Sequence, residues 1–201
     1  MPDTILVIAC GALVREIMDL KQRYRWDHLT LKCIDAKLHM RPALIPDRLR
    51  AMIRKYKNEY DEIFVAYADC GTCGGIDRVI EDEGIQRLPG AHCYQFFAGS
   101  ERFAALSDAE PGTFYLTDFL AQHFDQFVTK PLKFEEHPEL RDMYFGNYRR
   151  LVYLSQKKDA ALLDAARAAA VKLELEFEHV HVGYGELESG LRDMVQRQAV
   201  G

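Results

Sequence analysis

The chain has 201 residues, enough for one α/β domain or two small lobes with a buried core. Its apolar content of 48% and charged content of 28% are ordinary for a globular protein, and its net charge of −5 argues against a nucleic-acid-binding protein. No segment approaches the ~18 apolar residues of a membrane span. The N-terminus lacks the basic leader of a signal peptide, so we expect a cytoplasmic protein.

Short apolar runs alternate with helical patterns along the chain. Strands are expected at Thr4–Ala9, Leu29–Ile34, Glu62–Ala68, Gln86–Cys93, Arg150–Leu154 and Glu176–Val182. Helices are expected at Ala12–Tyr24, 46–60, Ile76–Glu83, Asp118–Val128, Pro138–Tyr148, 159–173 and Gly185–Val195, with Thr117 and Asp159 as N-caps. This alternation predicts an α/β fold with a mostly parallel, Rossmann-like sheet and helices on both faces. We expect one compact domain, 1–201, in which a break near 109–112 would separate lobes 1–110 and 111–201.

Three cysteines follow apolar strands at the point where each strand gives way to a loop. They are Cys10, Cys70 and Cys93. Ligands bind at the carboxyl ends of strands in open α/β sheets, so thiols that meet there would suit a metal. Soft, charged thiolates favour zinc or a [4Fe–4S] cluster, and the sequence does not decide between them. Three ligands would leave one position open for a substrate thiol or water.

Two other interpretations of these cysteines stay open. Free cysteine is among the most buried residue types, so the thiols would then only fill the core. Alternatively, Cys70 would be a nucleophile that needs no metal. Cys70 and Cys73 also form a C-x-x-C motif before a helix, which is compatible with a redox dithiol, and Cys73 would otherwise be a fourth metal ligand.

The segment after Cys70 is rich in glycine. Gly71, Thr72, Gly74 and Gly75 precede a predicted helix, where exposed backbone N–H groups can hold an anionic substrate or cofactor. The alternative is a tight turn without a ligand.

Two side chains are candidates for moving protons. His123 lies on an apolar helical stripe, where a histidine is more often a core residue than an acid or base. Asp69 directly precedes Cys70. His92 adjoins Cys93, but neighbouring side chains on a strand point to opposite faces, so we favour Cys93 as the ligand.

The chain resembles a family of uncharacterised bacterial and archaeal proteins. The resemblance rests on the stretches VIACGALVREI, VAYADCGTCGGID, HCY, PGTFYLTDFLAQHFDQFV and GYGELE, which span nearly the whole chain. Members of this family are often encoded beside corrinoid-dependent methyltransferases of the trimethylamine and glycine-betaine type. The resemblance therefore implies a role in one-carbon metabolism, but no established reaction or catalytic residue.

Together these observations predict a metal-dependent enzyme, or a factor that handles a cofactor, linked to methyl transfer. Its partners would be a small-molecule substrate and a corrinoid protein or methyltransferase, with no nucleic acid or membrane. A non-catalytic partner of such a methyltransferase and a metal-free cysteine enzyme are the alternatives.

Overall fold

The computed structural model of the protein describes residues 4–134 and 136–198. The chain divides into two compact units. Unit 1 comprises the described residues of Met1–Phe96 and Glu186–Gly201, and unit 2 comprises those of Phe97–Gly185. None of the helices in the described ranges has the length and apolar character that a membrane crossing requires.

Unit 1 is built on a four-stranded parallel sheet. Its strands are β1 (Ile5–Cys10), β2 (Leu29–Ile34), β3 (Glu62–Ala66) and β4 (Gln86–Arg87), in the order β2-β1-β3-β4. Every residue of β1 is buried, as expected for an apolar central strand covered on both faces. All four carboxyl ends lie at the same edge of the sheet because the strands are parallel.

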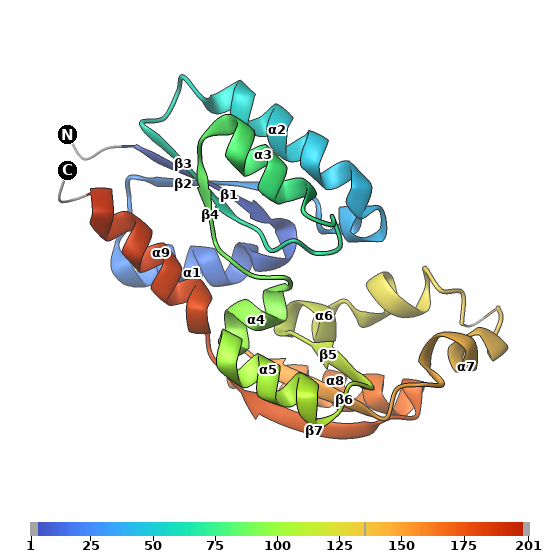
Figure 1. Cartoon of the computed structure of the whole chain (residues 1–201). Helices are drawn as coiled ribbons and strands as arrows, with labels where there is room; N and C mark the ends of the chain where they lie inside the picture. Colours follow the sequence, from blue (N-terminus) through green and yellow to red (C-terminus); the bar gives the residue numbers. More distant parts are fainter. Residues whose placement is uncertain (1–3, 135, 199–201) are drawn as a thin grey trace. The chain divides into compact units, whose positions relative to one another are not determined.

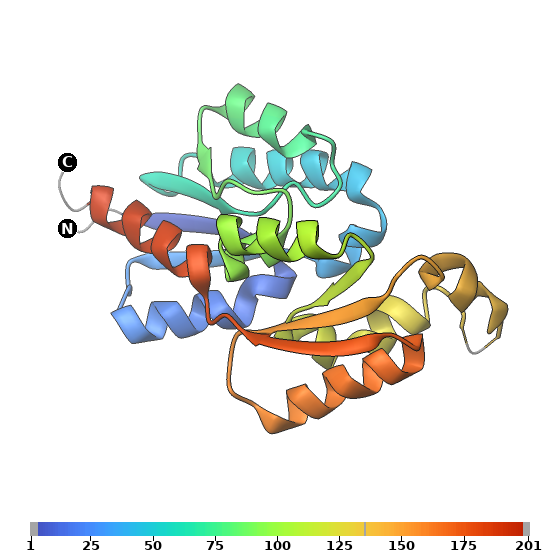
Figure 2. The same cartoon turned by 60° about the horizontal axis from the view of Figure 1, so that its bottom comes forward.

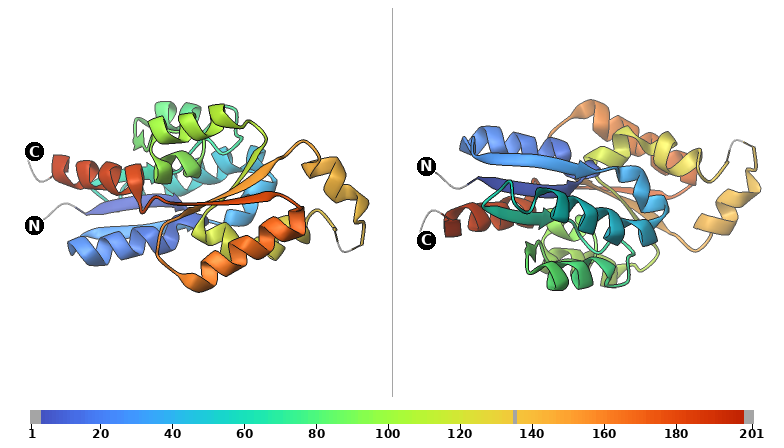
Figure 3. Two further views of the ribbon diagram at one scale, coloured as in Figure 1. Left: turned by 90° about the horizontal axis from the view of Figure 1, so that it is seen from below. Right: turned by 90° about the horizontal axis from the view of Figure 1, so that it is seen from above.

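Helices cover both faces of this sheet (Figure 1). The helices of unit 1 are α1 (Val14–Tyr24), α2 (Ile45–Tyr56), α3 (Gly75–Glu83), the start of α4 (Cys93–Ala98) and α9 (Gly185–Gln198). Helices α2 and α3 lie on one face, and α1 and α9 run side by side on the other (Figures 1 and 3). The Tyr24 hydroxyl on α1 hydrogen-bonds to the Glu188 carboxylate on α9.

Unit 2 contains a three-stranded parallel sheet in the order β5-β6-β7. Its strands are β5 (Thr113–Leu116), β6 (Arg150–Ser155) and β7 (Glu176–His181). Its helices are the end of α4, α5 (Ser100–Ala109), α6 (Asp118–Gln122), a π-helical turn (Asp125–Thr129), α7 (Glu139–Phe145) and α8 (Ala160–Leu173). Figure 2 shows α5 and α8 on opposite faces of this sheet.

The predicted α/β class with parallel strands and helices on both faces is confirmed. Both predicted caps are also present. The Thr117 hydroxyl accepts a hydrogen bond from the Leu120 N–H at 3.4 Å, and the Asp159 carboxylate accepts from the N–H groups of Ala161 and Leu162 at 2.9 and 3.2 Å. The sequence did not predict β5 or α5.

The predicted strand Gln86–Cys93 is wrong beyond Arg87. Strand β4 has two residues, and Cys93 begins helix α4. Pro89 lacks the N–H that a strand ladder needs, and Gly90 has a φ of 150°, which other residues rarely adopt. The chain therefore turns away from the sheet before Cys93.

Candidate functional site

Every strand of the unit 1 sheet leads into one group of side chains at the carboxyl edge. Cys10 ends β1, and His39 lies in a short 3-10 helix (Ala36–Met40) after β2. Tyr67 and Cys70 follow β3, and Cys93 follows β4. The next strand in the chain, β2, lies on one side of β1, and β3 lies on the other side. The strand order therefore reverses between β1 and β3, and ligands bind in such sheets outside the carboxyl ends at that point.

The three predicted thiols act on one another electrostatically. Burial, together with the charge of Cys10, raises the pKa of Cys70 to about 12. Burial also raises the pKa of Cys10 to about 11. The pKa of Cys93 is raised well above its ordinary value by burial and by the charges of Cys70 and Cys10. The structure thus brings together cysteines that are far apart in the sequence, and as isolated groups they are protonated at neutral pH.

The backbone around Cys70 is held in an uncommon conformation. Cys70 has a φ of 47° and Cys73 a φ of 53°, a region that glycine adopts far more easily. The Cys70 N–H donates to the Ala91 carbonyl at 2.9 Å, and the Asp69 N–H donates to the Gly90 carbonyl at 3.1 Å. These bonds fix the loop after β3 against the segment that leads to Cys93.

Asp69 organises the glycine-rich turn. Its carboxylate accepts hydrogen bonds from the Thr72 hydroxyl at 2.5 Å, the Cys73 N–H at 3.1 Å and the Gly74 N–H at 2.9 Å. The Gly75 N–H donates to the Thr72 carbonyl at 3.0 Å. An anion bound by these N–H groups would have to displace Asp69. The predicted ligand-binding role of Gly71, Thr72, Gly74 and Gly75 stays a prediction, as does proton transfer by Asp69.

Replacing Asp69 tests its structural role. We expect Asp69→Ala to lower the free energy of unfolding by about 2 kcal/mol, because it leaves several donors of the turn without an acceptor. Burial acts to raise the pKa of Asp69, but the hydrogen bonds hold it below 3.8. The stabilisation is therefore present above the unfolded-state pKa of this carboxyl and is lost as the pH falls through its lower folded-state pKa. Urea unfolding at several pH values measures it.

A matched control is Asp77→Ala, which removes an exposed carboxylate from its 2.6 Å ion pair with Arg87. Such surface pairs contribute less than about 1 kcal/mol. Equal losses in the two variants would contradict the role given to Asp69.

His39 is a member of this site that the sequence analysis missed. Both nitrogens of its ring lie 3.9 Å from the Cys10 sulfur. Its Nδ1–H donates to the Ala36 carbonyl at 2.9 Å, so Nε2 carries the free lone pair of the neutral ring. The ring stacks on Tyr67 with centroids 5.8 Å apart. Its position after a strand of the predicted sheet was the only signal in the sequence.

Tyr67 contributes a buried hydroxyl to the same group. The side chain has 0% exposure, and no described residue makes a regular hydrogen bond to its hydroxyl. The hydroxyl nevertheless lies close enough to Cys10 to lower the pKa of that thiol. Burial, followed by the charges of Cys10, Cys70 and Cys93, raises the pKa of Tyr67 itself. A buried donor beside three sulfurs is therefore available to a negatively charged acceptor.

Two further cysteines are exposed. Cys73 lies in the turn that Asp69 organises, and Cys33, on β2, acts to raise the pKa of Cys10. The Cys73 thiol lies 3.9 Å from the Gly71 carbonyl. His123 belongs to unit 2, where it ends α6 and its ring lies 4.8 Å from that of Phe119. Its role in proton transfer stays a prediction.

The thiols and the imidazole of the site are donors that suit a soft metal, but their present arrangement does not form a metal-binding group. In the described ranges, no three His, Cys, Asp or Glu side chains are grouped so that they could hold a metal ion. The charge of Cys10 nevertheless raises the pKa of Cys70, and both raise that of Cys93, so a cation among the three would favour their thiolates. Each cysteine has a single side-chain torsion, so its sulfur can be redirected by rotation about one bond.

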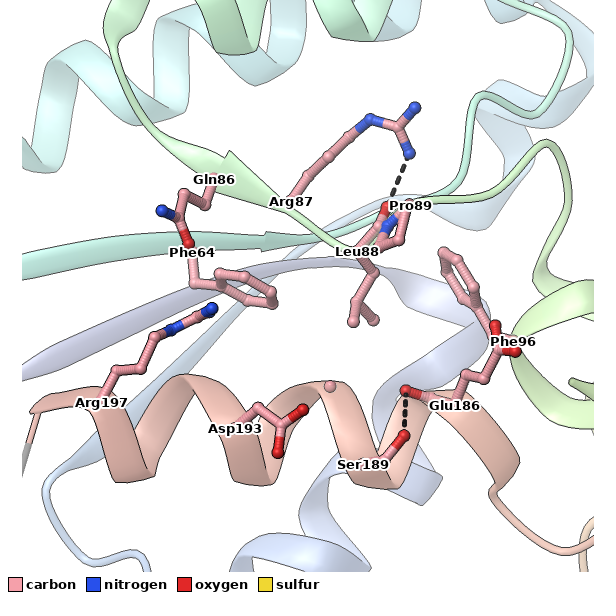
Figure 4. A pocket seen from close by; sticks show the side chains of 11 residues that line it. Phe64, Gln86, Arg87, Leu88, Pro89, Phe96, Glu186, Ser189, Asp193 and Arg197 are labelled. Carbon is pink, nitrogen blue, oxygen red and sulfur yellow. Dashed lines mark hydrogen bonds between the residues drawn. The ribbon is translucent and has the colours of Figure 1, made fainter. Parts of the chain in front are cut away.

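Unit 1 also contains a pocket of about 320 Å³ between the β3–β4 edge and α9. Figure 4 shows Phe64 and Leu88 pointing towards α9, with Arg197 and Asp193 facing them from the helix. It is lined by Phe64, Gln86, Arg87, Leu88, Pro89, Phe96, Glu186, Ser189, Gly190, Asp193 and Arg197. None of the cysteines lines it, so the pocket is distinct from the thiol site.

Unit 2 has a polar cluster of its own. The buried Asp118 carboxylate accepts from the Tyr153 hydroxyl at 2.7 Å and from the Gln156 N–H at 3.0 Å. The Ser155 hydroxyl lies 2.9 Å from a nitrogen of His179 and 3.0 Å from one of His181. The Ser155 contacts join the carboxyl ends of β6 and β7. The sequence analysis did not identify this cluster.

The fold and the site define a parallel α/β protein with a cysteine cluster at the carboxyl edge of one sheet. The chain belongs to the family described as "Protein of unknown function (DUF1638)", which matches residues 33–191. That segment contains His39, Cys70 and Cys93, whereas Cys10 precedes it. The predicted resemblance to an uncharacterised family is confirmed. No curated protein and no solved structure matches the chain.

Proposed function

We propose that this protein binds a soft metal centre, zinc or an iron–sulfur cluster, through Cys10, Cys70 and Cys93. The observation that supports the proposal is that thiols from different strand ends of one sheet lie close enough to interact: besides burial, the charge of Cys10 raises the pKa of Cys70, and the charges of both raise that of Cys93. Metal binding requires thiolates, and a cation would favour the charged form of the thiols that burial disfavours here. The metal would supply Lewis acidity to a substrate thiol or water.

The raised pKa values disfavour a metal-free nucleophile. A reactive cysteine needs a lowered pKa, because the thiolate is the attacking species. With a pKa of about 12, Cys70 is almost entirely protonated at neutral pH. Arg87 acts to lower this pKa, but burial and the neighbouring sulfur outweigh it.

We also propose that the centre serves corrinoid-dependent methyl transfer, as an enzyme or as a factor that handles a cofactor. This part rests on the resemblance described for the sequence. A thiolate metal centre supports it chemically, since a metal-bound thiolate is a strong acceptor for a methyl group.

Anaerobic purification followed by metal and sulfide analysis tests the site. We expect a stoichiometric metal in the wild-type protein and its loss in Cys10→Ala, Cys70→Ala and Cys93→Ala. Cys33→Ala and Cys73→Ala are the controls, because both thiols are exposed, and they should keep the metal. Brown protein with sulfide identifies a cluster, and colourless protein with zinc identifies a mononuclear site. Equal metal content in all five variants would rule out the proposed ligands.

A further inference from the structure

The thiol site has a nitrogen donor that already has the features of a metal ligand. Metal-binding histidines almost always donate their other ring N–H to a carbonyl or carboxylate, which fixes the ring and the tautomer. The Nδ1–H of His39 makes such a bond to the Ala36 carbonyl at 2.9 Å. Its Nε2 lone pair is therefore left for another partner.

The separation of His39 from Cys10 suits two ligands of one ion. Zinc–sulfur and zinc–nitrogen bonds at tetrahedral angles place the two donor atoms about 3.6 Å apart. In the structure, His39 Nε2 lies 3.9 Å from the Cys10 sulfur and Nδ1 lies equally far, so the sulfur has to turn towards the Nε2 side for the two residues to share an ion. Ligands bound to different irons of a cluster would be more widely spaced, because each would bind its own metal atom.

The backbone holds these two residues close together. Cys10 pairs with Ile34 in the β1–β2 register, and the 3-10 helix that carries His39 begins two residues later. A Cβ at Gly11 would lie 3.1 Å from both the Ala36 nitrogen and the Ile34 oxygen. Glycine at this position therefore allows the turn after β1 to pack closely against the segment that carries His39.

We propose that His39 is the fourth ligand of this metal, through Nε2, and that the metal is a single zinc-class ion bound by three cysteines and one histidine. This inference rests on the proposed metal function. Such a ligand set is common for zinc. His39 then occupies the position that a three-cysteine site would leave open, and a substrate would reach the metal by displacing it.

X-ray absorption of the zinc-loaded protein tests the assignment, because an imidazole ligand gives a multiple-scattering signature that water does not. We expect three sulfurs and one imidazole in the wild type. In His39→Ala we expect three sulfurs without imidazole and a zinc affinity at least about 10-fold weaker. His28→Ala is the matched control, since His28 lies just before β2, at the opposite end of the same strand, and should keep the imidazole.

The possible results separate the two proposals. Wild-type protein that binds no added Zn²⁺ would overturn the metal function itself, and with it the role of His39. Zinc bound by three sulfurs with no imidazole in the wild type would overturn the His39 assignment and leave the thiolate site intact. Loss of the imidazole signature in His39→Ala, while His28→Ala keeps it, would support the assignment. Urea unfolding of the metal-free variants checks that both are folded.

Discussion

Binding of one zinc ion should release close to three protons, and the number should stay near three at pH 9. The reason is the raised pKa of the thiols, about 11 for Cys10 and about 12 for Cys70, with Cys93 also well above its ordinary value. A thiol with the ordinary value of 9.0 is half-ionised at pH 9 and has only half a proton to release. Three ordinary thiols would therefore release about 1.5 protons.

The same linkage fixes the pH dependence of affinity. When three protons leave on binding, the apparent affinity for Zn²⁺ rises about 1,000-fold for each unit of pH below the thiol pKa values. Calorimetry in buffers of different ionisation enthalpy measures the protons, and competition with a chelator measures the affinity. Cys70→Ser should reduce the release to about two. A release near 1.5 in the wild type at pH 9 would show that the thiols titrate independently and in water.

The sequence predicted that the cysteines converge, because the positions of the strand ends depend only on local apolar runs. A buried apolar run that ends at Cys10, and another that ends before Cys70, define strand ends in any parallel α/β sheet. Parallel strands then bring those ends to one edge, whatever their order. Cys93 reached the same edge even though its predicted strand was wrong, because the segment Pro89–His92 only replaces a strand by a turn.

His39 and Tyr67 could not be identified in this way, because their contacts depend on pairing between distant segments. His39 lies beside Cys10 only through the register of β1 with β2. Tyr67 extends a buried apolar strand, where an aromatic residue is expected for packing alone. Its importance comes from the absence of a regular hydrogen-bond partner among the described residues, which no sequence pattern reveals.

The sheet against which the last helix packs could not be predicted from the sequence either. The spacing of Leu187, Leu191 and Val195 predicts a helix with one buried face, but not the sheet on which that face packs. In the structure Leu187 and Leu191 are buried, with Met194 rather than Val195. The structure assigns α9 to unit 1, where a Cβ at Gly190 would lie 2.3 Å from the Leu88 side chain. A glycine at this position permits the close packing of α9 on Leu88, and this contact is not apparent from either segment alone.

Tyr67→Phe should separate the metal site from the stability of the fold. Without metal, the change removes a buried hydroxyl that has no regular partner, so we expect the free energy of unfolding to stay the same or rise by up to about 1 kcal/mol. With metal, Cys10 is a thiolate and a strong acceptor, and the nearby Tyr67 hydroxyl can donate to it. Loss of such a donor to a ligand typically weakens metal binding about 10- to 100-fold.

Tyr153→Phe provides a control with the opposite expectation. Tyr153 is equally buried, but its hydroxyl donates to the Asp118 carboxylate at 2.7 Å in unit 2. Its loss should lower the free energy of unfolding by about 1–3 kcal/mol and leave zinc affinity unchanged. Urea unfolding of the metal-free proteins and chelator competition for Zn²⁺ measure both quantities. If Tyr67→Phe binds zinc as tightly as the wild type, its hydroxyl does not act on the metal ligands, and its burial reflects packing alone.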